Sequence, residues 1–127
     1  MTGKQILIVE DEKPIRDMIA FGLRRAGFEV REAEDCAAAR ASIADARPDV
    51  LLVDWMLPDQ SGLELTRAVK RSKDTQDLPV IMLTARAQNT DRNRAVTLGV
   101  HSYMVKPFSP IELMETVEKI LGESGCG

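Results

Sequence analysis

Five short apolar segments, separated by more polar stretches, constrain the fold of this chain more than any other feature of its sequence. They are QILIV from Gln5, EVREA from Glu29, VLLVD from Val50, PVIML from Pro79 and SYMV from Ser102. The first, third and fourth are continuous aliphatic runs without polar alternation, a pattern typical of strands that are buried on both faces. Such strands form parallel sheets that lie between two layers of helices.

The stretches between these segments have the period of helices. From Ile15 to Ala26, apolar residues recur at spacings of three and four, with Pro14 suited to the first turn and Gly27 to the end of a helix. Ser109 to Glu112 forms a capping box at the start of a last helix. Weaker helical patterns cover residues 37–46, 62–73 and 88–98. Strand and helix therefore alternate five times, which predicts a doubly wound α/β fold.

The bulk composition fits one soluble globular domain. The 127 residues are 44% hydrophobic and 29% charged, and the net charge of −3 comes with scattered lysines and arginines, so no basic surface for direct DNA binding is expected. The N-terminal apolar run is too short for a signal peptide or a membrane span, which predicts a cytoplasmic protein. We expect Cys36 and Cys126 to be free thiols. A single histidine, His101, makes a histidine metal site or a Ser-His-Asp triad hard to build.

Polar residues follow four of the five predicted strands. They are Glu10-Asp11-Glu12 after the first, Asp54 after the third, Thr84 after the fourth and Lys106-Pro107 after the fifth. Taken singly, each has an ordinary explanation as a loop, turn or helix-cap residue. In a doubly wound sheet, however, the ligand site lies at the carboxyl ends of the strands. Their joint placement at that edge favours a functional site.

The residue types at this edge indicate phosphoryl transfer. With strands one and three adjacent in the order 2-1-3-4-5, Asp11 and Asp54 should lie close together, and neighbouring carboxylates cannot all stay ionised without a cation. Oxygen ligands in a sparse site suit Mg²⁺ better than Ca²⁺. Lys106 adds a positive charge for a phosphate-like anion and Thr84 a hydroxyl donor. In such a site an aspartate can be the nucleophile.

Four motifs carry a resemblance to a known family. They are ILIVEDE, DVLLVDWMLPDQSGLEL, PVIMLTAR and YMVKPFSPIEL. In order and spacing they resemble the receiver domain of bacterial two-component response regulators, and most of all the OmpR/PhoB group with its phosphate-regulon regulators. The resemblance covers residues 4–122 and implies a flavodoxin-like (βα)5 fold with a five-stranded parallel sheet. Residues 123–127 would be a flexible tail or simply the end of the segment.

The resemblance implies a phosphoacceptor and a metal site. Asp54 would accept a phosphoryl group from the phosphohistidine of a sensor histidine kinase, giving an aspartyl phosphate. Asp11 and Asp54 would hold Mg²⁺ together with the main-chain carbonyl of Met56, while Glu10 and Glu12 would act directly or through water. The chain would not be an enzyme with a separate substrate, but a phosphoacceptor that catalyses its own phosphotransfer and slow dephosphorylation.

The resemblance also implies a switch. Lys106 and Thr84 would contact the phosphoryl group, and Tyr103 would turn inward as Thr84 moves. The bond between Lys106 and Pro107 is expected to be cis, which proline makes far less costly than any other residue. The face formed by the fourth helix, fifth strand and fifth helix would then change and serve as a homodimer surface.

Three positions depart from the OmpR/PhoB pattern. His101 and Ser102 stand where the group carries two acids before the switch aromatic, and Thr116 stands where it carries an arginine. The phosphotransfer residues are unaffected, but both ends of one expected ion pair between subunits are missing, so whether the usual homodimer forms stays open.

Two alternatives concern the output and the chemistry. The subfamily likeness favours a transcription factor that would contact DNA only through an output domain beyond Gly127, whereas a stand-alone receiver would signal through protein–protein contacts. A more remote alternative is an Mg²⁺-dependent phosphatase with an aspartate nucleophile. Such enzymes usually carry a second acid two residues after the nucleophile, where this chain has Met56.

Overall fold

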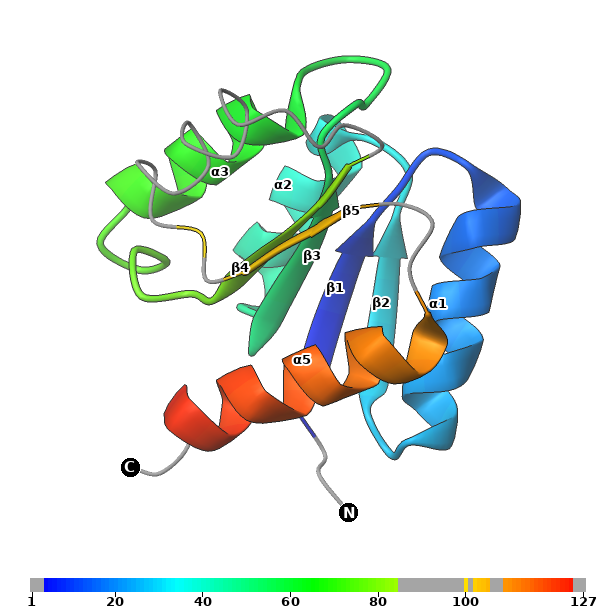
Figure 1. Ribbon diagram of the computed structural model, residues 1–127. Coiled ribbons are helices and arrows are strands. Elements are labelled where there is room, and N and C mark those ends of the chain that lie inside the picture. The colour runs from blue at the N-terminus through cyan, green and yellow to red at the C-terminus, as the bar shows by residue number, and fades with distance from the viewer. Residues whose placement is uncertain (1–3, 85–99, 101, 106–108, 125–127) are drawn as a thin grey trace.

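Five parallel strands form one sheet in the order β2-β1-β3-β4-β5 (Figure 1). The computed structural model describes residues 4–84, 100, 102–105 and 109–124. The strands are β1 (Gln5–Val9), β2 (Glu29–Ala33), β3 (Val50–Asp54), β4 (Val80–Thr84) and β5 (Ser102–Val105). The predicted strands, their order and the doubly wound fold are confirmed. The helix expected at 88–98 lies outside the described residues, as do His101, Lys106, Pro107 and Cys126.

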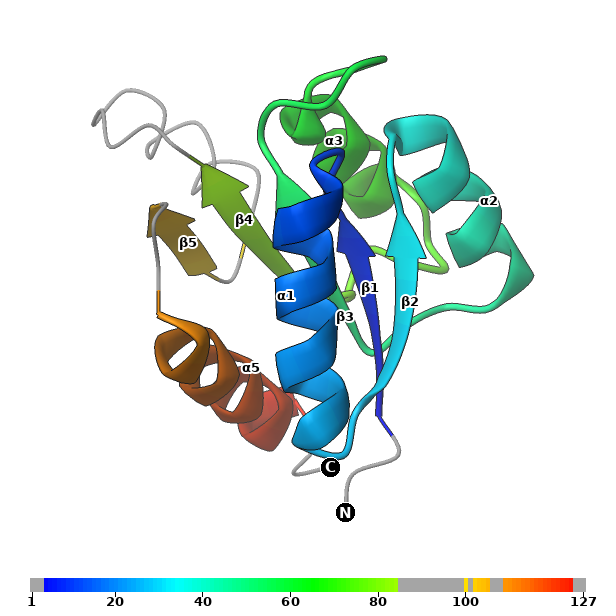
Figure 2. The same ribbon diagram turned by 90° about the vertical axis from the view of Figure 1, so that its right-hand side faces the viewer.

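Helices cover both faces of the sheet. They are α1 (Lys13–Arg25), α2 (Cys36–Asp45), α3 (Gly62–Arg71) and α5 (Pro110–Ser124). Helices α1 and α5 lie on one face and α2 and α3 on the other (Figure 2). Alternate residues of each strand therefore enter two separate cores: Leu7, Leu51 and Met82 face α2 and α3, and Ile6, Leu52 and Ile81 face α1 and α5.

The strand sequences reflect their places in the sheet. Strands β3 and β4 are buried along their whole length, as their continuous aliphatic runs predict. Strand β2 lies at the edge and is partly exposed, which explains its charged residues. Among the described residues, no helix has the length and apolar character that crossing a lipid bilayer requires.

Most of the predicted helix ends agree with the structure. Gly27 has a φ of 98° directly after α1, a left-handed conformation that glycine adopts without strain. Ser109 Oγ accepts from the amides of Ile111 at 3.1 Å and Glu112 at 3.4 Å at the start of α5. Helix α3 ends at Arg71, two residues before the predicted end, and α5 ends at Ser124.

Candidate metal site at the carboxyl ends of the strands

Three carboxylates meet where β1 and β3 end. Val9 pairs with Val53 in the parallel register, so the next residues, Glu10 and Asp54, lie side by side at the edge of the sheet. One ligand atom from each of Glu10, Asp11 and Asp54 lies within 4.8 Å of the other two. Glu10 is 0% exposed and Asp54 4% exposed, whereas Asp11 is exposed. The cluster therefore combines two buried carboxylates with one that opens to solvent, and Asp11 and Asp54 lie close together as the strand order predicts.

Glu10 is held through both its main chain and its side chain. Its amide donates to the carbonyl of Ala33 at 3.0 Å, which extends the β1–β2 ladder by one residue. Its Oε2 accepts from the amide of Glu12 at 3.1 Å, at the start of α1. Glu12 thus contributes its main chain to the cluster, and its own carboxylate is exposed and not one of the three that converge.

The main chain around Asp54 is fixed by neighbouring elements. Asp54 Oδ1 accepts from the amide of Met56 at 3.2 Å, and the Trp55 amide donates to the carbonyl of Leu83 at 2.7 Å, continuing the β3–β4 ladder. The amide of Gly62, the first residue of α3, donates to the carbonyl of Trp55 at 2.8 Å. Strand β3 and the loop after it are therefore closed into a short, hydrogen-bonded turn.

Gly62 has a steric role that sequence reasoning missed. A Cβ added there would stand 2.1 Å from the carbonyl oxygen of Asp54, far inside van der Waals contact. Only glycine permits α3 to start this close to the end of β3. The signal in the sequence is a glycine at the first turn of a predicted helix, but its contact becomes visible only in three dimensions.

Asp59 anchors the same loop to α2, a second feature that the sequence did not reveal. Its Oδ1 accepts from the amide of Cys36 and its Oδ2 from the amide of Ala37, each at 3.0 Å. These amide donors, the Cys36 amide first, lower the pKa of Asp59. Burial, with Asp59 close by, raises the pKa of Cys36 to about 11, and this cysteine is a free thiol as predicted.

Thr84 and Tyr103 occupy the two strands beyond Asp54. Thr84 ends β4 one residue after Leu83, the partner of Asp54, and is fully buried. Tyr103 on β5 is partly buried, and its ring contacts that of Trp55 edge to face, with centroids 6.4 Å apart. Tyr103 therefore touches the residue next to Asp54.

The donor set fits a hard divalent cation. Two carboxylates buried side by side repel each other unless a cation or a proton compensates them. Within the described residues the cluster offers only oxygen ligands, with no histidine or cysteine, which excludes the usual zinc coordination. The group of Glu10, Asp11 and Asp54 can hold a metal ion.

The response regulator receiver domain family matches residues 6–118, so the chain belongs to this family. Among curated relatives, it is 48% identical to the phosphate regulon transcriptional regulatory protein PhoB of Pseudomonas aeruginosa over 127 residues, covering 100% of this chain and 56% of the relative. It is 44% identical to the PhoB of Escherichia coli K12 over 119 residues, covering 94% of this chain and 52% of that protein. The chain spans about half the length of these relatives.

Solved structures agree with the fold. The chemotaxis protein CheY4 of Vibrio cholerae superposes with a TM-score of 0.89 at 32% identity, covering 94% of this chain and 100% of that one. A CheY-like receiver domain protein from Methanospirillum hungatei JF-1 superposes with a TM-score of 0.90 at 30% identity, covering 96% of each chain. The predicted relationship to the OmpR/PhoB group of receivers is confirmed.

Proposed function

We propose that this chain is the phosphoacceptor domain of a two-component response regulator and that Asp54 receives the phosphoryl group from a sensor histidine kinase. The observation that carries this proposal is the convergence of Glu10 and Asp11 on a nearly buried Asp54 at the carboxyl edge of the sheet. A charge so placed is costly unless a cation or a reaction requires it.

In the proposed step, a carboxylate oxygen of Asp54 attacks the phosphorus of a phosphohistidine. The new phosphorus–oxygen bond forms as the phosphorus–nitrogen bond breaks, and the imidazole nitrogen leaves with that electron pair and takes up a proton. The hydrogen bond from the Met56 amide to Asp54 Oδ1 orients the carboxylate for the attack. Because the turn between β3 and α3 is already formed, little rearrangement of the main chain is needed.

Mg²⁺ is the cation that we propose for this site. Asp11 and Asp54 would hold it with the main-chain carbonyl of Met56, and Glu10 would act directly or through water. When bound, Mg²⁺ would supply positive charge against the oxygens of the transferring phosphoryl group. Glu12 is the weakest part of this ligand set, because its side chain is exposed and outside the carboxylate cluster.

Thr84, Lys106 and Tyr103 complete the proposed mechanism. The hydroxyl of Thr84 and the ammonium of Lys106 would bind phosphoryl oxygens. The side chain of Tyr103 would turn inward as Thr84 moves. Phosphorylation adds about one unit of negative charge and new acceptor oxygens, enough to bias a two-state element by a few kcal/mol at most. The contact between Tyr103 and Trp55 supports a coupling to Asp54, since this ring lies against its neighbour in the chain.

The proposed output is control of transcription through a second domain. The curated relatives are named transcriptional regulatory proteins, and this chain spans about half of their length. We propose that DNA is contacted only by an output domain and that homodimerisation through the helix expected at 88–98, β5 and α5 transmits the signal. Thr116 carries no charge for an ion pair between subunits, and its hydroxyl donates to the carbonyl of Glu112 in its own helix. A stand-alone receiver is the alternative output.

Phosphorylation from a small-molecule donor tests the proposal. The wild type and Asp54→Ala are incubated with acetyl phosphate, with and without Mg²⁺, and their intact masses are measured. We expect the wild type to gain one phosphoryl group only with Mg²⁺, and the variant to gain none. An equal gain by the variant contradicts the assignment of Asp54. A wild type that releases inorganic phosphate rapidly while its intact mass never shows a phosphorylated chain would instead support the phosphatase alternative.

A further inference from the structure

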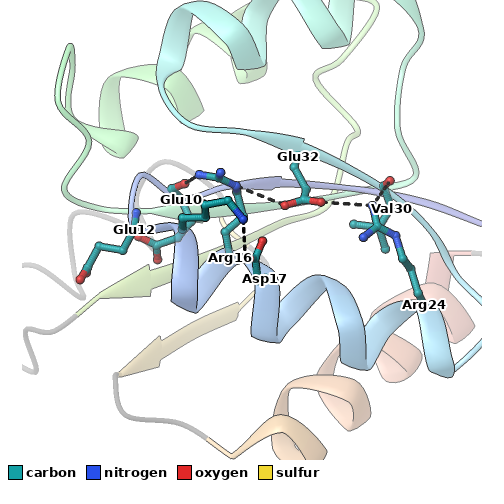
Figure 3. A network of polar contacts seen from close by, with 8 residues as sticks. Glu10, Glu12, Arg16, Asp17, Arg24, Val30 and Glu32 are labelled. Atoms are coloured by element: carbon teal, nitrogen blue, oxygen red, sulfur yellow. Dashed lines mark hydrogen bonds and ion pairs between the residues drawn. The ribbon is translucent and has the colours of Figure 1, made fainter.

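An arginine lies directly against the acidic cluster without belonging to it. Arg16, on the first turns of α1, donates from Nη1 to the main-chain carbonyl of Glu10 at 2.8 Å and from Nε to Glu32 Oε1 on β2 at 3.2 Å (Figure 3). Its side chain is only 13% exposed. The guanidinium therefore joins α1, the end of β1 and the edge strand at one point.

Arg16 binds the carbonyl of the peptide group that joins Glu10 to Asp11. The two residues on either side of this peptide therefore carry two of the three clustered carboxylates. The Glu10 amide is held by Ala33 and the Glu10 carboxylate by the Glu12 amide, while Arg16 holds the carbonyl. Because the planar peptide is fixed on the Glu10 side, its orientation determines the direction in which Asp11 leaves the strand.

Glu32 holds the guanidinium in this position. It receives Arg16 through Oε1 and Arg24 through Oε2, each at 3.2 Å, and Arg24 also donates to the carbonyl of Val30 (Figure 3). The ion pair between Arg16 and Glu32 is mostly shielded from water, whereas the Arg24 side chain is 52% exposed. Both arginines thus share one carboxylate, but only Arg16 reaches the peptide at the metal site.

We propose that Arg16 is a positioning residue for the metal site, an inference that rests on the proposed function. It acts by fixing the Glu10–Asp11 peptide and with it the spacing of the carboxylates, as groups behind metal ligands commonly do. A positive charge near a cation site would by itself weaken cation binding. The two roles therefore have opposite signs: removing Arg16 weakens Mg²⁺ binding if it positions ligands, and strengthens it if only its charge matters.

Arg16→Met and Arg24→Met form a matched pair for the test, since each removes one arginine from Glu32. Mg²⁺ is titrated into the wild type and both variants while the fluorescence of Trp55 is recorded. We expect the Kd for Mg²⁺ to rise by about tenfold in Arg16→Met and by less than about twofold in Arg24→Met. Binding by Arg16→Met that equals or exceeds that of the wild type overturns the proposal.

A second readout needs no metal. The amide of Asp11 belongs to the same peptide group as the carbonyl that Arg16 binds, so its NMR cross-peak reports on this bond. In Mg²⁺-free buffer we expect the Asp11 and Glu12 cross-peaks to move in Arg16→Met and to stay in place in Arg24→Met. Cross-peaks that move equally in both variants would show an effect of Glu32 alone and overturn the proposal.

Two further controls address a variant that does not fold and a wild type that does not bind Mg²⁺. Should Arg16→Met fail to fold, Arg16→Lys is compared with Arg24→Lys, because lysine keeps the charge but cannot make both bonds with the geometry of a guanidinium. We expect a weaker Kd for Mg²⁺ in Arg16→Lys alone, and unchanged binding there overturns the proposal. A wild type that neither binds Mg²⁺ nor gains a phosphoryl group refutes the proposed function instead, and the Mg²⁺-free spectra still decide whether Arg16 orients the peptide.

Discussion

Replacing Gly62 with alanine is expected to destabilise the fold and to disturb the main chain at Asp54 at the same time. The new Cβ would stand 2.1 Å from the carbonyl oxygen of Asp54 and 3.0 Å from its carbonyl carbon, and ordinary contact starts at 3.4 Å. Both partners are backbone, so no side chain can rotate away. Either the start of α3 or the end of β3 must move by about 1 Å, in a region packed as densely as a crystal.

The cost can be estimated from the surroundings of the new methyl group. Overpacking of a dense site typically costs about 1–3 kcal/mol, and the backbone contact places Gly62→Ala at the upper end, about 3 kcal/mol. The hydrogen bond from the Gly62 amide to the Trp55 carbonyl would also lengthen, which adds about 1 kcal/mol. For a domain of this size such a loss lowers Tm by roughly 10–15 °C.

Gly122→Ala is the matched control, because a Cβ there meets nothing within 4 Å and the residue lies inside α5. Alanine in the interior of a helix stabilises it by about 0.5–1 kcal/mol relative to glycine. Urea unfolding measures both variants, and Mg²⁺ titration followed by Trp55 fluorescence reports on the site. If Gly62→Ala unfolds at the same urea concentration as the wild type, the argument from close backbone approach is refuted.

Three further predictions concern the cluster and its loop. Asp11→Asn should raise Tm in Mg²⁺-free buffer by about 2–4 °C, because it relieves the repulsion between carboxylates. It should also abolish the rise in Tm that we expect Mg²⁺ to give the wild type. Thermal unfolding with and without Mg²⁺ measures both effects. Asp59→Ala should unfold at a lower urea concentration than Asp59→Asn, which keeps one acceptor for the amides of α2. The pKa of Asp59 is lowered in the folded state, so the stability that its charge contributes is present above its ordinary pKa of 3.8. This stability is lost as the pH falls through the lowered value. The urea midpoints of the wild type and Asp59→Asn should therefore converge below pH 3.8. In a Cys126→Ser chain, Cys36 should react with a disulfide reagent at pH 8 at least about tenfold more slowly than free cysteine, because burial raises its pKa to about 11; equal rates would contradict its burial.

The sheet could be predicted from the sequence because its signals are local. Continuous aliphatic runs identify β3 and β4, and the acids and hydroxyl that end the strands fall together once the strand order is known. Asp11 and Asp54 could be paired before any coordinates, since parallel strands present their carboxyl ends at one edge.

The supports of the site could not be predicted, since they depend on contacts between distant parts of the chain. Asp59 looks like a turn residue, yet it caps a helix that begins 23 residues earlier. Gly62 resembles any glycine at the start of a helix until the approach of Asp54 is seen. Arg16 has the sequence signature of a solvated helix face, and only the tertiary fold brings its guanidinium to the carbonyl of Glu10.

Chemical mapping of the phosphorylated residue tests the central claim most directly. The wild type is phosphorylated with acetyl phosphate and Mg²⁺, then reduced with borohydride, which converts an aspartyl phosphate to homoserine. Tandem mass spectrometry of the peptides locates the converted residue. We predict homoserine at position 54 alone, and only when Mg²⁺ was present. Conversion at Asp11 or at another acid, with position 54 unchanged, would contradict the account.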